Sequence, residues 1–281
     1  MSYDIKRLEN NERKVVSNLG NFAVLEHLKD QSVAPDNAAN HYFMSQMGVR
    51  RRQVIIQVDN DHPATVQASS MQWIAGKVES TTGLKGAGDL LGKLVKGAVT
   101  KESAIKPEYV GNGLVVLEPT YKYIILQDVS DWGPYGMCVE DGMFLACDSN
   151  VQQKIVARTT LSSAVLGNEG LFNLALRGHG VVALESNVPY DELIEIELNN
   201  DVLKIDGENA VAWSADLDFT VERSSKTLIG SAVNKEGLVN VYRGTGKVLM
   251  SPIVVNTQSL FATTHNSKWS IYKTYTIIDI I

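Results

Sequence analysis

One short motif occurs three times in this sequence at nearly constant spacing. Gly-x-Gly pairs start at positions 111, 178 and 244, so the steps between them are 67 and 66 residues. The pairs are Gly111 and Gly113, Gly178 and Gly180, and Gly244 and Gly246. Each pair leads into an apolar run of strand type, where glycine commonly marks a tight turn, a bulge or a close backbone approach. A fixed period of this size indicates tandem structural units.

A second motif has the same period. Asp141-Gly142 and Asp206-Gly207 each lead into a short apolar run, and they lie 65 residues apart. Runs rich in Val, Ile, Leu and Tyr, separated by Gly, Asn and Asp, continue from Phe22 onwards. We therefore predict an all-β protein. Its core is expected to be a β-sandwich or double-stranded β-helix of about three tandem repeats around a pseudo-threefold axis, with both motifs at repeat turns.

Two segments are expected to be helical. Residues 4–18 are polar with loosely spaced apolar residues, which predicts a short helix. Residues 88–99 carry leucine, valine and alanine at helical spacing with lysines between them, which predicts an amphipathic helix. The favoured interpretation is that this second helix caps one end of the β core. The alternative is a helix that binds a membrane surface or a partner protein.

The charge of the chain argues against a protein that coats nucleic acid. Lys and Arg total 26 against 32 Asp and Glu, a net charge of −6, whereas phosphate binding needs surplus positive charge. Arg50-Arg51-Arg52 is the only basic cluster. Nucleic-acid recognition needs several such patches with aromatic residues between them. We interpret the triplet as the solvent-facing start of a strand or as an anchor for an acidic neighbour.

The sequence gives no positive support for an enzyme. The Gly-x-Gly pairs precede strands and lack a third glycine, so they do not match a dinucleotide fingerprint. Residues 83–94 resemble a phosphate-binding loop, but five residues separate Gly86 from Gly92, and Leu94 stands where Ser or Thr would hold magnesium. The five histidines are scattered. We expect no catalytic residue, no cofactor and no metal site.

The two cysteines are expected to be core residues. Cys138 and Cys147 lie in apolar runs with eight residues between them, a spacing that fits neither a redox pair nor paired zinc ligands. A disulfide is the next interpretation, ahead of a metal site. The sequence shows no signal peptide and no run near the ~18 apolar residues of a membrane-spanning helix. We therefore expect a cytoplasmic protein without a transmembrane segment.

Taken together, these motifs resemble the altered-inheritance-of-mitochondria number twenty-four family over roughly residues 50–252. The segments that carry the resemblance are 68–73, 82–97, 102–104, 111–113, 141–147, 170–172, 177–180 and 242–246. The resemblance implies a β fold similar to the tryptophan RNA-binding attenuation protein, repeated about a pseudo-threefold axis. The family has no established catalytic residues to transfer. Its mitochondrial members are linked to inner-membrane organisation, a role we do not carry over because no transit peptide is recognised here.

The chain is expected to have three parts. Residues 1–49 form an N-terminal extension with a short helix and the first strands, residues 50–252 form the three-repeat core, and residues 253–281 form a tail. The tail alternates like a strand, so it pairs with an exposed sheet edge or is disordered. We expect a non-enzymatic interaction or scaffold protein that forms a homo-oligomer or binds a protein partner. The alternatives are a small-ligand or nucleic-acid binding module and a protein with peripheral membrane contact.

Overall fold

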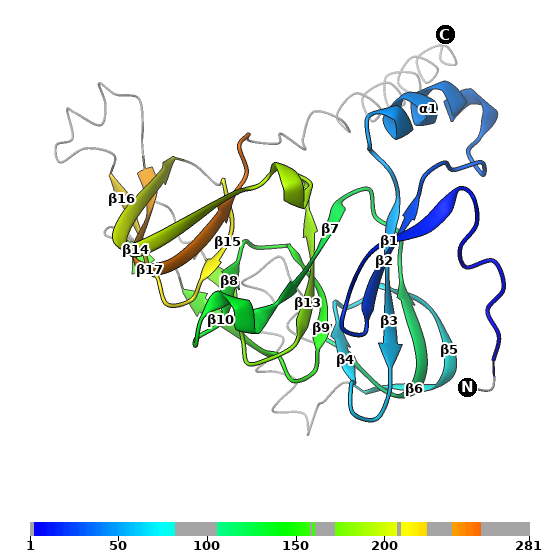
Figure 1. Ribbon diagram of the computed structural model, residues 1–281, viewed down its shortest axis with the longest axis horizontal. Coiled ribbons are helices and arrows are strands. Elements are labelled where there is room, and N and C mark those ends of the chain that lie inside the picture. The colour runs from blue at the N-terminus through cyan, green and yellow to red at the C-terminus, as the bar shows by residue number, and fades with distance from the viewer. Residues whose placement is uncertain are drawn as a thin grey trace, which may run out of the picture.

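The computed structural model describes residues 3–81, 106–157, 159–160, 172–206, 209–223 and 238–253 (Figure 1). Within these ranges the chain forms two large sheets, and every strand pairing is antiparallel except that of β11 (Thr159–Thr160) with β16 (Asp218–Arg223). The prediction of an all-β protein is confirmed.

The first sheet has nine strands. Their order is β1 (Arg13–Leu19), β2 (Phe22–His27), β3 (Arg52–Val58), β6 (Glu108–Leu117), β4 (Ala64–Val66), β9 (Phe144–Asp148), β13 (Val181–Ser186) and β7 (Tyr123–Asp128), with β5 (Met71–Thr81) paired to β6 off this path. The sheet curls so that β7, at one end of the path, contacts β1 and β3 near the other end.

The second sheet has eight strands. Their order is β10 (Gln152–Ala157), β12 (Phe172–Arg177), β8 (Met137–Val139), β15 (Ala210–Ser214), β17 (Leu238–Met250), β16 and β11, with β14 (Ile194–Asp206) paired to β17 off this path. Figure 1 shows β14 to β17 at one end of the molecule and β1 to β6 at the other. The chain enters the second sheet through β8, which follows β7 of the first sheet.

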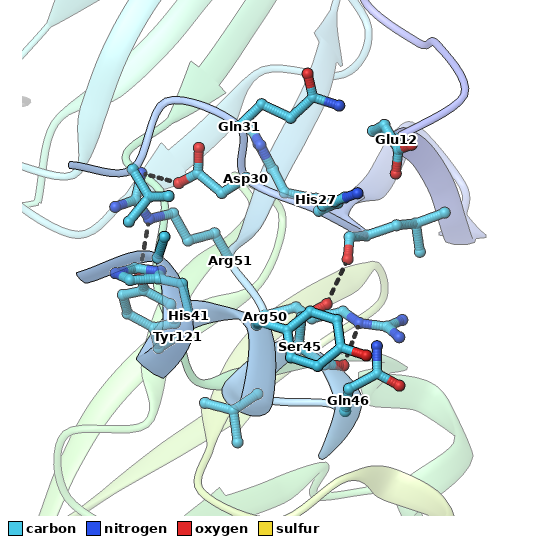
Figure 2. A pocket seen from close by; sticks show the side chains of 16 residues that line it. Glu12, His27, Asp30, Gln31, His41, Ser45, Gln46, Arg50, Arg51 and Tyr121 are labelled. Atoms are coloured by element: carbon cyan, nitrogen blue, oxygen red, sulfur yellow. Dashed lines mark hydrogen bonds and ion pairs between the residues drawn. The ribbon is translucent and has the colours of Figure 1, made fainter. Parts of the chain in front are cut away.

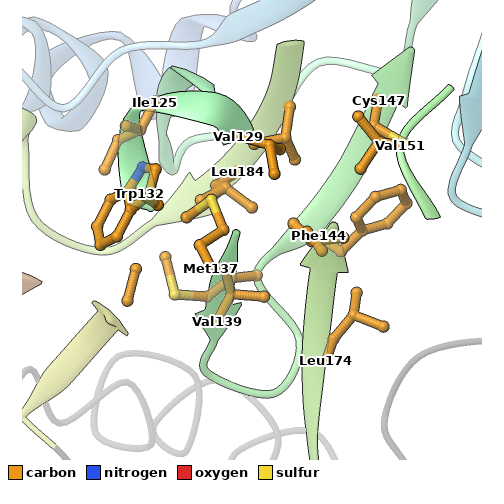
Figure 3. Packing of buried hydrophobic residues seen from close by; sticks show 14 of the residues in the cluster. Ile125, Val129, Trp132, Met137, Val139, Phe144, Cys147, Val151, Leu174 and Leu184 are labelled. Atoms are coloured by element: carbon orange, nitrogen blue, oxygen red, sulfur yellow. The ribbon is translucent and has the colours of Figure 1, made fainter. Parts of the chain in front are cut away.

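The main hydrophobic cluster lies where the two sheets meet (Figure 3). Trp132, Met137 and Leu184 are at most 2% exposed and pack in this cluster. The alternation of a strand explains how β13 serves two clusters: Val182 and Leu184 face this one, and Val181 and Ala183 face the interior of the first sheet. Each buried leucine or valine contributes roughly 1.5–3 kcal/mol by removal from water, so this shared strand ties the sheets together.

The predicted helix within residues 4–18 is wrong, because that segment contains strand β1. β1 and β2 form a hairpin in which Leu19 pairs with Phe22 across the two-residue loop Gly20-Asn21. Gly20 has φ +55°, a conformation that favours glycine, and the Gly-Asn dipeptide between apolar runs is a hairpin signal. Because β2 also pairs with β3, residues of the predicted N-terminal extension belong to the same sheet as the core.

The α-helix among the described residues lies elsewhere. It is α1 (Ala38–Gln46), preceded by a 3-10 turn at Pro35–Asn37, and it connects β2 to β3. Two further 3-10 turns lie at Val129–Trp132 and Tyr190–Glu192. The predicted helix at residues 88–99 and the tail from residue 254 onwards lie outside the described residues.

Candidate functional site

The residues predicted to form repeat turns lie partly within strands and partly in the turns between strands. Gly111 and Gly113 lie within β6, Gly244 and Gly246 within β17, and Gly178 and Gly180 in the turn between β12 and β13. All of these except Gly113 have positive φ. Asp141 and Gly142 form the turn before β9, Asp206 ends β14, and Gly207 lies outside the described residues. These positions shape the backbone, and their assignment to a repeat stays a prediction.

The most unusual surface of the described chain is the helix α1. None of its nine residues is buried, and its sequence, AANHYFMSQ, contains no Asp, Glu, Lys or Arg. Phe43 is 65% exposed, and Met47 in the following turn is 78% exposed. Tyr42 and Val49 are exposed beside them, and Tyr121 is exposed in the segment before β7. We call these five residues the α1 surface.

A cavity of about 560 Å³ opens beside this helix. Figure 2 shows the side chains around it, which come from the end of β2 and the segment after it, from α1 and from the segment before β3, together with Glu12 before β1 and Tyr121 before β7. It is lined by Glu12, His27, Leu28, Lys29, Asp30, Gln31, Val33, Ala38, His41, Tyr42, Ser45, Gln46, Val49, Arg50, Arg51 and Tyr121. This size is within the usual range for small-ligand pockets. We call it the α1 cavity.

Arg51 is held within the α1 cavity by two neighbours (Figure 2). Its Nη1 lies 2.8 Å from Oδ2 of Asp30, and its Nε donates a hydrogen bond of 3.0 Å to the Tyr121 hydroxyl. The guanidinium carbon also lies 5.4 Å from the centre of the Tyr121 ring, in cation–π range. The ring of His41 lies 6.4 Å from that of Tyr121, so one aromatic residue joins α1 to the arginine segment.

The hydrogen-bond pattern fixes the proton on His27. The amide nitrogen of Gln53 donates to Gln72 Oε1 and to the Leu117 carbonyl. The amide oxygen of Gln53 therefore faces the Nε2 atom of His27, 2.9 Å away. Since this oxygen only accepts, Nε2 carries the hydrogen, and Nδ1 is the acceptor of the neutral ring. His27 is one of the residues that line the α1 cavity.

Of the two interpretations of the arginine triplet, the anchor for acidic neighbours is confirmed. Arg50 lies 2.8 Å from the Glu26 carboxylate, and Arg52 lies 2.7 Å from the other oxygen of the same group. Arg52 is 6% exposed and stacks over the Tyr123 ring at 4.1 Å. These guanidinium groups neutralise buried or half-buried carboxylates of their own chain, so they do not form a free basic patch.

Both cysteines are buried free thiols, at 7% exposure for Cys138 and 0% for Cys147. The core interpretation is confirmed, and the disulfide interpretation is wrong. Burial raises the pKa of Cys138 to about 11 and raises that of Cys147 further. A thiol that is protonated and buried neither ligates a metal nor acts as a nucleophile.

The searches for a metal site and for a membrane span cover the described part of the chain. No group of three or more His, Cys, Asp or Glu side chains among those residues is arranged to hold a metal ion. Nor is any helix within the described ranges both long and apolar enough to span a bilayer. In the α1 cavity, Arg51 and Asp30 are paired with each other, while aromatic and apolar side chains stand exposed next to them.

Sequence reasoning missed both α1 and its cavity. Pro35 before the helix and Gly48 after it, with φ +76°, are the start and stop signals that mark such a segment. The apolar periodicity on which helix predictions depend is nearly absent from a helix with no fully buried side chain. The cavity also needs Tyr121, which is 70 residues from Arg51 in sequence.

The fold and this surface define an all-β protein with two large sheets, whose connection between β2 and β3 presents a short exposed helix. The profile of the family described as mitochondrial biogenesis AIM24 matches residues 45–253. The chain therefore belongs to the AIM24 family, as its motifs predicted. Most of α1 and the whole β1–β2 hairpin precede the matched range.

Two proteins from Streptococcus pyogenes are similar to this chain. An uncharacterised protein of serotype M6 is 29% identical over 210 residues, which cover 71% of this chain and 81% of that protein. The crystal structure of another S. pyogenes protein matches with a TM-score of 0.52 and 24% identity, over 81% of this chain and 94% of that one. This second likeness shows the same fold.

Proposed function

We propose that this chain is a non-enzymatic interaction protein that assembles with a second copy of itself through the α1 surface and the α1 cavity. The observation that carries the proposal is a helix with no buried side chain that exposes Phe43 and Met47. Isolated helices shorter than about 12 residues are marginal in water, because most helical stability in proteins comes from packing. A nine-residue helix with its aromatic and thioether side chains exposed gains that packing from a partner.

Charge and shape favour a second copy as this partner. A two-fold interface places the same surface against itself, so a charged surface would bring like charges together. α1 has no charged residue and avoids this cost. The surface also combines protruding side chains, Phe43 and Met47, with a neighbouring cavity of about 560 Å³. In a symmetric pair, the protruding side chains of each copy can therefore enter the α1 cavity of the other copy.

The available area is sufficient for a weak dimer. With roughly 100 Å² exposed on each of the five side chains, one copy offers about 500 Å² and a symmetric pair about 1,000 Å², near the lower bound for a specific interface. We therefore expect a concentration-dependent equilibrium between monomer and dimer rather than an obligate assembly.

Sedimentation velocity over a wide range of protein concentrations tests the proposal. The wild-type protein is expected to shift from monomer to dimer, and the double variant Phe43→Ser, Met47→Ser is expected to stay monomeric with an unchanged far-ultraviolet spectrum. The matched control is Val202→Ser, which replaces a 47% exposed side chain on β14, at the other end of the molecule in Figure 1. A wild-type protein that is monomeric throughout, or a double variant that still dimerises, would contradict the proposal.

A small ligand in the α1 cavity is the second candidate function, favoured by the size of the cavity and by the polar residue His27 in its lining. Native mass spectrometry of gently purified protein separates the two candidates. A dimer without added mass supports assembly, whereas a monomer with a reproducible added mass supports a ligand. Nucleic-acid binding is disfavoured by the net charge of −6 and by arginines that pair with acids of the same chain.

The predicted internal repeat is retained as part of this proposal, and strand registers support it. Cys147 pairs with Val182, and Ala146 with Ala183; adding 66 to each number gives the pairs Trp213 with Val248 and Ala212 with Leu249. The bulge that follows in each ladder falls at the same place. The β10–β12 and β16–β17 ladders are related by the same shift of 66. Equal registers and equal bulges are the pattern expected of two copies of one unit.

A further inference from the structure

A single carboxylate organises the connection between the first sheet and α1. Glu26 lies directly across from Arg52 in the β2–β3 ladder and is 8% exposed. Its Oε2 lies 2.7 Å from Nη2 of Arg52, and its Oε1 accepts a hydrogen bond of 2.8 Å from Nη1 of Arg50. Each oxygen of one buried carboxylate therefore holds a different arginine.

Arg50 also contacts the last turn of α1, and Arg52 contacts the turn that follows the helix. Arg50 Nε donates to the Ser45 carbonyl at 3.2 Å, and Arg52 Nη2 donates to the Gly48 carbonyl at 3.0 Å. The last carbonyls of a helix carry partial negative charge, so cationic donors stabilise them. Since no side chain of α1 is fully buried, these polar contacts add to the limited packing of its partly buried residues His41, Met44 and Ser45.

From this geometry we infer that Glu26 is the positioning residue for α1: it holds Arg50 where it donates to the Ser45 carbonyl in the last turn, and Arg52 where it donates to the Gly48 carbonyl just after the helix. The inference rests on the proposed function, because α1 is the element through which assembly is proposed. Without the carboxylate, two guanidinium groups would stand close together with no counter-charge, and their separation would remove both donors from the helix. α1 would then lose its fixed placement while the sheets stay folded.

Hydrogen exchange measured by mass spectrometry tests this with Glu26→Gln. We expect exchange of the amides in residues 38–49 to accelerate by about tenfold or more, with little change in the amides of β9 and β13. The matched control is Glu185→Gln, because Glu185 pairs with Lys122 at 2.9 Å in the same sheet and does not touch α1. The control is expected to leave exchange in α1 unchanged. Equal exchange of α1 in the wild type and in folded Glu26→Gln would overturn the inference.

A second variant covers the case in which Glu26→Gln does not fold. Arg50→Gln removes the donor to Ser45 but leaves the buried Glu26–Arg52 pair in place. It is expected to accelerate exchange in α1 by a smaller factor than the loss of Glu26, and unchanged exchange would again overturn the inference.

The hydrogen-exchange measurement is independent of assembly, since it can be made at concentrations where the protein is monomeric. A wild-type protein that never dimerises contradicts the proposed function alone, whereas unchanged exchange contradicts the role of Glu26 alone.

Discussion

Asp148 and Ser214 are 66 residues apart and accept equivalent hydrogen bonds in two parts of the fold. The Val181 amide donates to Oδ2 of Asp148 at 2.7 Å, and the Lys247 amide donates to Oγ of Ser214 at 3.0 Å; donor and acceptor are 33 residues apart in both cases. The acceptor lies next to a glycine of positive φ each time, Gly180 and Gly246. A neutral hydroxyl serves as well as a carboxylate here, so the hydrogen bond needs an acceptor but not a charge.

The first prediction concerns the charge of Asp148. Burial raises the pKa of Asp148, and hydrogen bonds from Val181 and Asn21 offset only part of that effect. The folded state therefore binds the proton more tightly than the unfolded state, so this group contributes less stability as the pH rises above its ordinary value of 3.8. Asp148→Asn is expected to gain stability relative to the wild type between about pH 4 and about pH 7, measured by urea unfolding.

Asp128 provides a control because its pKa is shifted in the opposite direction from that of Asp148. Its pKa is raised by burial but lowered overall by hydrogen bonds from Ser130 and Gly180. A depressed pKa means that ionised Asp128 adds stability above the unfolded pKa and loses it as the pH falls. Asp128→Asn should therefore be less stable than the wild type at neutral pH, and the difference in unfolding free energy should shrink as the pH falls below about 4. A stability difference for Asp128→Asn that stays constant as the pH falls below about 4 would contradict this sign.

The second prediction compares two glycines of the repeated motif. Gly111 and Gly244 have similar φ values, +116° and +119°. A Cβ at Gly111 would overlap the Lys77 carbonyl oxygen, whereas a Cβ at Gly244 would meet nothing closer than Leu217 Cδ2 at 3.8 Å. Gly244→Ala is expected to cost roughly 1–2 kcal/mol of unfolding free energy from backbone strain alone, and Gly111→Ala more than about 3 kcal/mol.

Urea denaturation of both variants, with the wild type alongside, measures this difference. Because the conformational penalty is nearly the same at the two sites, the difference between the variants isolates the contact with Lys77. Similar losses of stability would mean that the paired strands β5 and β6 shift to accommodate the methyl group. The close approach of Gly111 to the Lys77 carbonyl would then be unimportant for stability.

The sequence predicted the sheets well because their signal is local. Short continuous apolar runs, as in β3 and β13, predict buried strands directly. The loosely spaced apolar residues of 4–18 do not distinguish a helix from a strand, and the Gly20-Asn21 loop is the local signal that marks the β1–β2 hairpin.

The candidate site could not be predicted from the sequence, for a different reason. Arg51 and Tyr121 meet because their neighbours Arg52 and Thr120 form an antiparallel bridge beside the β3–β6 ladder. This pairing joins segments far apart in the sequence, and no local pattern predicts it. α1 gives a weak helical signal because, of the partly buried residues His41, Met44 and Ser45 on its one packed face, only Met44 is apolar. An exposed surface of this kind is found from exposure in the folded chain.

The last prediction concerns the two thiols. With the pKa of Cys138 at about 11, the thiolate fraction at neutral pH is on the order of 10⁻⁴, and Cys147 is more strongly protonated still. Both side chains are also buried, so a disulfide reagent reaches them only when the chain opens. We expect no prompt reaction of Ellman's reagent with the native protein and two thiols per chain in guanidinium. Prompt reaction in the native state would mean that at least one of the two cysteines is not buried. Replacing each cysteine in turn by Ala identifies the one that reacts. Fewer than two thiols in the unfolded chain, without reductant, would instead reveal a disulfide, contrary to the free thiols of the structure.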